Sequence, residues 1–353
     1  MRVFVFILLF VFPIAGNAQK YFIQFKDKPN IEKFNPYTFF DSKAIERRIK
    51  HNLPVFDESD VPVYQSYVDD LSIHCDSITN VTRWFNGVFA YSREIEKIKN
   101  LPFVKDVYPV ESYTRKTICA LDSSAKFEHL EKLREQQLSL FEARYFEENH
   151  LTGKGVRIAI FDVGFPSVQE HPAFEHLRKE NKIVGTYDFV RDREEPYTSH
   201  WHGTAVLSCI AGKMNGKILG TAPDAEFLLA RTESFIAEQL VEEENWLVAA
   251  EWADRNGADI INSSLGYTKH RYFRKDMNGE TSLVAAAAKM AVRKGILVVN
   301  AAGNDGNSDW LLIGTPADVD SVLSVGGVDP ETRVKVNFSS LGPNRKGIMK
   351  PNV

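Results

Sequence analysis

The feature that most constrains the fold is an alternation of short apolar runs and helix-like segments that begins after Gly153. The apolar runs occupy residues 156–161, 226–230, 259–262, 296–300 and 322–325. Apolar residues at helical spacing mark the segments 203–212, 238–255 and 282–294 between them. Continuous apolar strands that alternate with helices are typical of a mostly parallel sheet covered by helices on both faces. We therefore predict an α/β fold for this part of the chain.

The preceding part of the chain has a different pattern, which predicts a small α+β module. Strand-like runs lie at 21–25, 87–91 and 104–108, and helix-like stretches lie at 42–50 and 92–99. Residues 115–149 are then rich in Glu, Lys, Arg, Gln, Leu and Ala and contain neither Gly nor Pro. That composition favours a helical connector with one exposed side.

The first residues have the pattern of a secretory signal peptide. Arg2 is followed by an apolar run at 3–14, and small residues precede Gln19. Because the run is shorter than the roughly 20 residues that span a bilayer, we expect no transmembrane anchor. The expected location is secreted, periplasmic or at the cell surface. We expect four parts: a signal peptide at 1–18, the module at 19–114, the connector at 115–150 and the α/β domain at 151–353.

The charge of the chain argues against a nucleic-acid partner. The 353 residues include 47 acidic and 43 basic side chains, a net charge of −4. Nucleic-acid binding requires a basic surface that neutralises phosphates, and no such excess is present. A protein or peptide ligand fits this composition better.

Asp162 follows the first predicted strand directly and precedes Gly164. Working residues of parallel sheets gather beyond the carboxyl ends of the strands, so this carboxylate lies where a site is expected. By itself the segment fits an ordinary Asp-initiated turn equally well.

His202 lies at or just before the start of a predicted helix in the segment His-Gly-Thr. The positive end of the helix dipole disfavours an imidazolium there, which predicts a neutral ring that accepts a proton. An adjacent carboxylate would fix its tautomer and stabilise the positive charge once it forms. His200 is the rival candidate, although it precedes the turn and fits a loop residue better.

Asn304 lies where the predicted strand at 296–300 runs out into small residues and glycines. Such a segment allows a backbone and a side-chain amide to approach a substrate closely. The Asn304 amide would then donate a hydrogen bond to a developing oxyanion. A simple Asn-Asp-Gly turn is the alternative.

Four segments resemble the subtilisin family of serine proteases in both order and spacing. They are Asp-Val-Gly at 162–164, His-Gly-Thr at 202–204, Asn-Ser-Ser-Leu-Gly at 262–266 and Ala-Gly-Asn at 302–304. The resemblance extends from about Leu151 to the end of the chain. It implies a subtilisin-like fold and hydrolysis of peptide bonds in protein or peptide substrates.

The resemblance also implies a role for each matching residue. Asp162 would orient His202, His202 would act as general base and acid, and Asn304 would line the oxyanion hole. Ser264, Leu265 and Gly266 would bind the substrate backbone. Family members often bind calcium, but the acidic residues show no loop spacing that assigns ligands, so no metal ligand is predicted and no other cofactor is expected.

Two departures from the family pattern affect the expected chemistry. Val163 stands where the family usually has Thr or Ser, which removes a hydroxyl beside Asp162. The family's serine lies in a Gly-Thr-Ser motif that opens a helix, and this motif does not occur in the 353 residues. Ser339 and Ser340 belong to a preceding segment. We expect the serine segment beyond Val353, and we expect the chain as it stands to be inactive.

The N-terminal module resembles the inhibitory propeptides of the same family. The matching segments are Phe-Asn-Gly-Val-Phe-Ala at 85–90, the helix with Ile95 and Ile98, and Leu-Pro-Phe-Val at 101–104. The stretch 44–48 is similar to propeptides from Bacteroidetes-type bacteria. The resemblance implies an intramolecular inhibitor that also assists folding.

Three hypotheses follow from the sequence. The first is the precursor of a secreted endopeptidase, and the second is a pseudoprotease that binds peptides without cutting them. The third places the function in the N-terminal module as a protease inhibitor. The sequence beyond residue 353 discriminates the first two.

Overall fold

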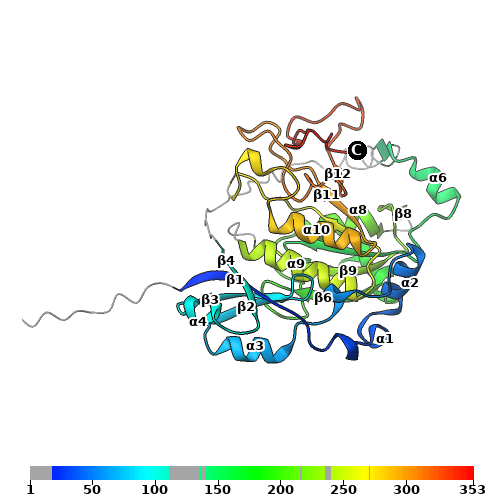
Figure 1. Ribbon diagram of the computed structural model, residues 1–353. Helices are drawn as coiled ribbons and strands as arrows, with labels where there is room; N and C mark the ends of the chain where they lie inside the picture. Colours follow the sequence, from blue (N-terminus) through cyan, green and yellow to red (C-terminus); the bar gives the residue numbers. More distant parts are fainter. Residues whose placement is uncertain are drawn as a thin grey trace, which may run out of the picture.

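The computed structural model describes residues 18–110, 135–136, 138, 140–214, 217–234, 240–269 and 271–353. Its centre is a six-stranded sheet in which every neighbouring pair of strands is parallel (Figure 1). In spatial order the strands are β12 (Leu323–Val325), β11 (Leu297–Ala301), β10 (Ile260–Ser263), β5 (Arg157–Asp162), β9 (Glu226–Arg231) and β6 (Ile183–Asp188). The predicted α/β fold with a parallel sheet is confirmed.

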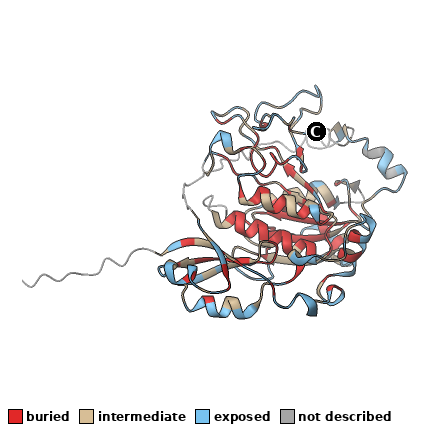
Figure 2. Cartoon of the chain, viewed as in Figure 1, coloured by how far each residue is buried: buried red, intermediate tan, exposed pale blue. Residues whose placement is uncertain are grey.

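Helices cover both faces of this sheet because its strands carry apolar side chains on both sides. Helices α9 (Leu240–Arg255) and α10 (Leu283–Arg293) pack with Ala159 and Phe161 in one buried cluster. Helix α8 (His202–Ala211) packs with Ile158 and Ile160 in the other. Consecutive residues of β5 therefore point to opposite faces, and all six are buried. Figure 2 shows the resulting buried core.

One part of the sheet lacks a complete cover on the α8 side. Asn262 of β10, Val299 of β11 and Val325 of β12 line a cavity of about 670 Å³ together with Cys209 of α8 and with apolar side chains of the segment 141–151. Val325 is 38% exposed. Since parallel sheets are normally buried on both faces, this apolar face is suited to receive a further element.

The N-terminal module, residues 18–110, is built on a separate antiparallel sheet. Its strands, in the order in which they pair, are β2 (Ser77–Thr82), β3 (Gly87–Ser92), β1 (Gln19–Phe25) and β4 (Val104–Pro109). One face of the sheet forms a core with Leu71 and Ile98. On the other side Trp84 and Phe89 join the apolar cluster of α9 and α10. The module, blue to cyan in Figure 1, is thereby packed on these two helices.

The remaining elements are short. The helices are α1 (Pro36–Phe39), α2 (Ser42–Lys50), α3 (Gln65–Ser72), α4 (Ile95–Lys99), α6 (Ala143–Glu148) and α7 (Glu175–Lys179). Single 3-10 turns are η1 (Ile31–Lys33), η2 (Glu58–Asp60), η4 (Pro172–Phe174) and η5 (Arg274–Asp276), and β7 (Lys213–Met214) pairs with β8 (Lys217–Ile218).

Most predicted elements are present, and those that were not predicted are short or lie at sheet edges. All eight strands that the pattern indicates exist. The edge strands β2 and β6, which contain several polar residues, were not predicted, and neither were the two-residue strands β7 and β8 or the short helices α1, α3 and α7. Of the predicted connector helix, residues 115–134 lie outside the described residues, and α6 falls in its last part. Within the described part of the chain, no helix has the length and apolar character needed to cross a membrane.

Candidate active site

The candidate site lies where β5, β10 and β11 end on the same edge of the parallel sheet. Asp162 is the last residue of β5, and Ser263 and Ala301 are the last residues of β10 and β11. In the register of these strands, Ser263 is level with Phe161 on one side and with Asn300 on the other. The segments that follow the three strands therefore leave the sheet side by side, as expected for a site on a parallel sheet.

Helix α8 brings His202 to this edge, since it begins at this residue. The next residue, Gly203, lies against the end of β5. A Cβ atom at Gly203 would overlap the carbonyl oxygen of Gly164 and would lie 2.9 Å from Cβ of Asp162. Only glycine permits so close an approach of helix and strand.

Asp162 and His202 form a direct hydrogen-bonded pair. Nδ1 of His202 lies 2.9 Å from Oδ1 and 3.0 Å from Oδ2 of Asp162. The Asp162 side chain is fully buried, whereas the His202 side chain is 40% exposed. Among the hydrogen bonds of the described residues none engages Nε2 of His202. The carboxylate therefore fixes Nδ1 as the protonated nitrogen and leaves Nε2 as an acceptor.

Two opposing effects on His202 were predicted from the sequence. The hydrogen bond that His202 donates to Asp162 raises the pKa of His202 above its usual value, against the opposing effect of burial, and the charge of Asp162 adds to the increase. The helix terminus was predicted to favour the neutral ring and the adjacent carboxylate to stabilise the charge once it forms, and the raised pKa follows the second of these effects. The imidazolium is thus stabilised once a proton is taken up.

His200 does not share this position. Its Nδ1 accepts a hydrogen bond of 3.3 Å from the backbone N–H of His202. Partial burial lowers the pKa of His200, and the neighbouring His202 lowers it further. The preference for His202 over His200 as the partner of Asp162 agrees with this geometry.

Arg231 supports the Asp162 segment and was not found from the sequence. Asp162, Arg231 and Asp188 are level with one another across β5, β9 and β6. Nε of Arg231 donates to the carbonyl oxygen of Val163 at 3.1 Å, and its Nη1 lies 2.9 Å from Oδ2 of Asp188. The sequence feature that could have identified Arg231 is its position directly after an apolar strand, a position that Asp162 also has.

The absence of a hydroxyl at Val163 leaves Asp162 with a backbone donor. The N–H of Val163 donates to Oδ1 of Asp162 at 2.8 Å. The carboxylate is thus held by its own chain on one side and by the imidazole on the other. The backbone hydrogen bond therefore helps to orient this carboxylate.

Asn304 is an exposed residue on the loop after β11. Two hydrogen bonds hold this loop to Ser340: the N–H of Ser340 donates to the carbonyl oxygen of Gly303, and the N–H of Asp305 donates to Oγ of Ser340, both at 3.0 Å. Gly303 has a φ of +105°, which favours glycine. These contacts fix the path of the loop. The amide side chain of Asn304 lies outside the hydrophobic core.

Ser264, Leu265 and Gly266 follow β10 on the same edge. Leu265 is buried, and its carbonyl oxygen accepts a hydrogen bond of 2.8 Å from the side chain of Asn300. Gly266 is exposed, and a Cβ atom there would have no neighbour nearer than 3.9 Å. The open side of this segment leaves room for an extended peptide.

Ser339 and Ser340, neither of which was assigned as the nucleophile from the sequence, hold backbone groups in place. Both side chains are buried. Oγ of Ser339 accepts from the N–H of Gly327 at 2.9 Å, and Oγ of Ser340 accepts from Asp305.

The described residues give no assignment for a metal. Nowhere among them do three His, Cys, Asp or Glu side chains converge as metal ligands would. The calcium that the family resemblance implies is therefore given no ligands and no part in the chemistry.

A buried carboxylate that orients a partly exposed imidazole has the geometry of the acid–base pair in a nucleophilic hydrolase site. Residues 153–353 match the subtilase family, Peptidase S8, and residues 20–124 match the peptidase S8 propeptide domain of Bacteroidota. The first match covers more than half of the chain. The chain therefore belongs to the subtilase family.

Individual relatives agree with this assignment. Serine protease AprX of Bacillus subtilis (strain 168) is 32% identical over 219 residues, which cover 58% of this chain and 46% of AprX. Subtilisin DY of Bacillus licheniformis is 32% identical over 222 residues, which cover 61% of this chain and 71% of that protein. Subtilisin E of Bacillus subtilis (strain 168) is 32% identical, and the chain spans about half of its length, 51%.

A solved structure of the prenylagaramide maturation protease PagA aligns with 57% of this chain and 64% of its own, with 26% identity and a TM-score of 0.43.

Proposed function

We propose that this protein is the precursor of a secreted serine endopeptidase in which Asp162 and His202 are the acid and base of the catalytic triad. The observation that carries the proposal is the contact of 2.9 Å between the buried carboxylate and Nδ1 of the imidazole at the carboxyl edge of the sheet. Membership of the subtilase family supports the serine-dependent mechanism.

In the proposed reaction, Nε2 of His202 takes the proton of the serine hydroxyl while Oγ forms a bond to the substrate carbonyl carbon. Asp162 stabilises the imidazolium that results. The amide of Asn304 donates a hydrogen bond to the oxyanion of the tetrahedral intermediate. His202 then returns the proton to the leaving amine as the C–N bond breaks, and water releases the acyl group by the same sequence of transfers.

We propose that the serine belongs to a helix that follows Val353. Two observations support this proposal. The backbone of Val353 is hydrogen-bonded beside β12, where its carbonyl oxygen accepts from Gly326 at 2.8 Å. The incompletely covered face of β10, β11 and β12 next to α8 offers an apolar surface on which such a helix packs.

For substrates, we propose extended segments of proteins or peptides that align with Ser264, Leu265 and Gly266. The N-terminal module is proposed as an inhibitor of the same chain, as its match to the S8 propeptide domain suggests. The pattern of residues 1–18 supports export, so the proposed location is outside the cytoplasm, in the periplasm, at the surface or in the medium.

Labelling of the complete protein with a fluorophosphonate tests this function. The wild type is expected to be labelled at a serine beyond residue 353, and His202→Ala is expected to reduce the labelling rate at least 100-fold because the serine loses its base. Equal labelling of both proteins would contradict the role of His202. A complete protein without any labelled serine would instead be a peptide-binding pseudoprotease.

A further inference from the structure

A buried amide on β11 holds the segment that follows β10. Asn300 is fully buried, and its Nδ2 donates to the carbonyl oxygen of Leu265 at 2.8 Å and to that of Ala301 at 2.9 Å. Because both neighbours are carbonyl oxygens, the amide nitrogen and not the amide oxygen must face them. Asn300 thus ties the segment 264–266 to the strand that leads to the loop of Asn304.

The oxygen of the same amide has no partner. Oδ1 of Asn300 is buried and accepts no hydrogen bond from any described residue. Ser263 and Ser324 are level with Asn300 on the two neighbouring strands, but their hydroxyl groups are engaged by Trp246 and by Asn352. An unpaired buried acceptor is unfavourable, so an apolar side chain would suit this position better if stability alone mattered.

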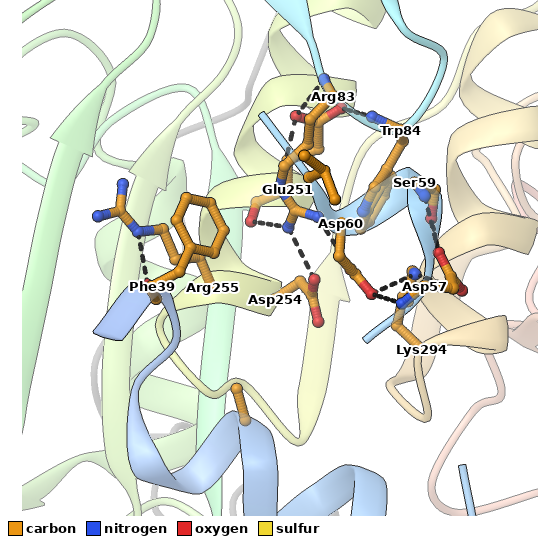
Figure 3. A network of polar contacts seen from close by, with 12 residues as sticks. Phe39, Asp57, Ser59, Asp60, Arg83, Trp84, Glu251, Asp254, Arg255 and Lys294 are labelled. Carbon is orange, nitrogen blue, oxygen red and sulfur yellow. Dashed lines mark hydrogen bonds and ion pairs between the residues drawn. The ribbon is translucent and has the colours of Figure 1, made fainter. Parts of the chain in front are cut away.

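Buried carboxylates at the contact between α9 and the N-terminal module are paired, in contrast to this oxygen. Figure 3 shows the fully buried Asp254 with Nη2 of Arg83 at 2.7 Å. Glu251 accepts hydrogen bonds from the backbone N–H groups of Arg83 at 3.1 Å and Trp84 at 3.0 Å (Figure 3). A buried polar group that lacks such a partner calls for a reason other than stability.

The contact with Asn300 determines which way the backbone after β10 points. The carbonyl oxygen of Leu265 faces β11, and the N–H and C=O groups of Tyr267 pair with Thr315 at 3.0 and 3.2 Å. In an extended chain the backbone groups of alternate residues point to opposite sides. Those of Ser264 and Gly266 are therefore directed away from β11, toward the side of the sheet on which β5 lies. No described residue forms a hydrogen bond with the backbone of Gly266.

We propose that Asn300 is a positioning residue for substrate binding. Its amide holds the carbonyl group of Leu265 inward, and this contact sets the direction of the outward backbone groups of Ser264 and Gly266. An extended peptide that pairs with these groups adds a strand to the edge of the segment. This inference deepens the proposed function and rests on it.

The contact of Asn300 is separate from the contacts that hold the loop of Asn304. That loop is bound to Ser340 by two hydrogen bonds of 3.0 Å. A small reagent that reacts with the serine does not extend along the segment 264–266, whereas a long peptide does. Loss of the Asn300 donor is therefore expected to affect long peptides selectively.

Peptides of different length test the proposal in the complete protein. Substrates with two and with four residues before the scissile bond are compared, and fluorophosphonate labelling measures the reactivity of the serine. In the wild type the longer peptide is expected to have the higher kcat/KM, because it reaches the segment. Asn300→Leu, which branches at the same carbon but has no donor, is expected to reduce this gain about tenfold and to leave the labelling rate within about threefold.

Asn344→Leu is the matched control, because Asn344 is also a buried amide whose Nδ2 donates to a backbone carbonyl oxygen, that of Asp318, at 2.8 Å. It is expected to lower stability and to leave the gain with peptide length within about twofold of the wild type. A gain in Asn300→Leu equal to that of the wild type would overturn the proposal. An equal loss of the gain in both variants would do the same.

Asn300→Asp covers the case in which Asn300→Leu does not fold. Its carboxyl group has the shape of the amide and donates a hydrogen bond when protonated, whereas the ionised form repels the two carbonyl oxygens. The gain with peptide length, relative to the wild type at the same pH, is therefore expected to fall about tenfold as the pH rises and the carboxyl group ionises. A relative gain that equals that of the wild type at every pH would contradict the proposal.

Failure of this inference is distinguishable from failure of the proposed function. A complete protein without a labelled serine would contradict the proposed function, and the effect of Asn300→Leu would then be measured on the dissociation constants of the two peptides. The same dependence on peptide length in both proteins would overturn the role of Asn300. A labelled serine together with an unchanged gain in Asn300→Leu would contradict the role of Asn300 alone.

Discussion

Gly203 and Asp162 pack so closely that even the smallest side chain at position 203 would meet Cβ of Asp162 at 2.9 Å. This contact sets the distance between the start of α8 and the end of β5. Since Asp162 and His202 come from these two elements, the glycine determines whether the two side chains meet.

Gly203→Ala is therefore expected to displace His202 and to lower kcat about 100-fold in the complete protein, because small misplacements of catalytic groups have effects of this size. The measurement is the rate of peptide hydrolysis, with the folded state checked by circular dichroism. Ser208→Ala on the same helix is the control, because its hydroxyl bonds only within α8. A fully active Gly203→Ala protein would show that this spacing is unimportant.

The pH dependence of hydrolysis is expected to report the raised pKa of His202. The general base acts in its neutral form, so activity falls as pH decreases through a pKa that lies above the usual value of about 6.5. Asp162→Asn removes the group that raises this pKa. Its kcat is expected to fall about 10⁴-fold, the effect typical of replacing the orienting carboxylate, and the midpoint is expected to move to lower pH. The pH profile of kcat/KM measures both effects, and an unchanged midpoint would refute the assigned interaction.

Arg231 is expected to act as a positioning residue for Asp162 through the carbonyl oxygen of Val163. Arg231→Met would leave the buried Asp188 without its nearest cation and is expected to destabilise the fold by about 3–5 kcal/mol. Arg231→Lys keeps the positive charge but has a single nitrogen, so it cannot reproduce both the Nε and the Nη1 contact of the guanidinium. It is expected to fold, with kcat reduced about tenfold at unchanged KM and with a shifted pH midpoint.

Chemical denaturation and the pH profile together check this prediction. A change in stability alone, with kcat and the pH midpoint unaffected in Arg231→Lys, would assign Arg231 to folding and not to the site.

Asn304→Ala is expected to lower kcat about 10²- to 10³-fold with little change in KM, because the amide is proposed to bind the oxyanion only after attack on the carbonyl. Steady-state kinetics on a peptide substrate measure this difference. Asn307→Ala, three residues further along and also exposed, is the control. If both substitutions lowered kcat equally, the cause would be a disturbed loop and not the loss of the Asn304 hydrogen-bond donor.

The sequence predicted the parts of the site that depend on local pattern. Asp162 follows an apolar strand and His202 opens a helix, and both features are visible in a few neighbouring residues. The contact between them required only that the two elements meet at one sheet edge, as α/β folds require.

The parts that were missed depend on residues far apart in the chain. Arg231 supports Val163 because β9 pairs with β5, and this pairing is not encoded in either segment alone. Asp254 follows the pattern of an exposed helix end, yet it is buried because Arg48 and Arg83 approach it from the N-terminal module.

The hydrogen bonds between Ser340 and the loop of Asn304 affect the time at which this loop can fold during synthesis. Chains emerge from the ribosome beginning with the N-terminus, and domains fold as their residues become available. Asp162 and His202 emerge early, but Gly303 and Asp305 gain their hydrogen bonds only after Ser340 has left the ribosome. The loop that carries the proposed oxyanion donor is consequently completed late, long after the N-terminal module has been made.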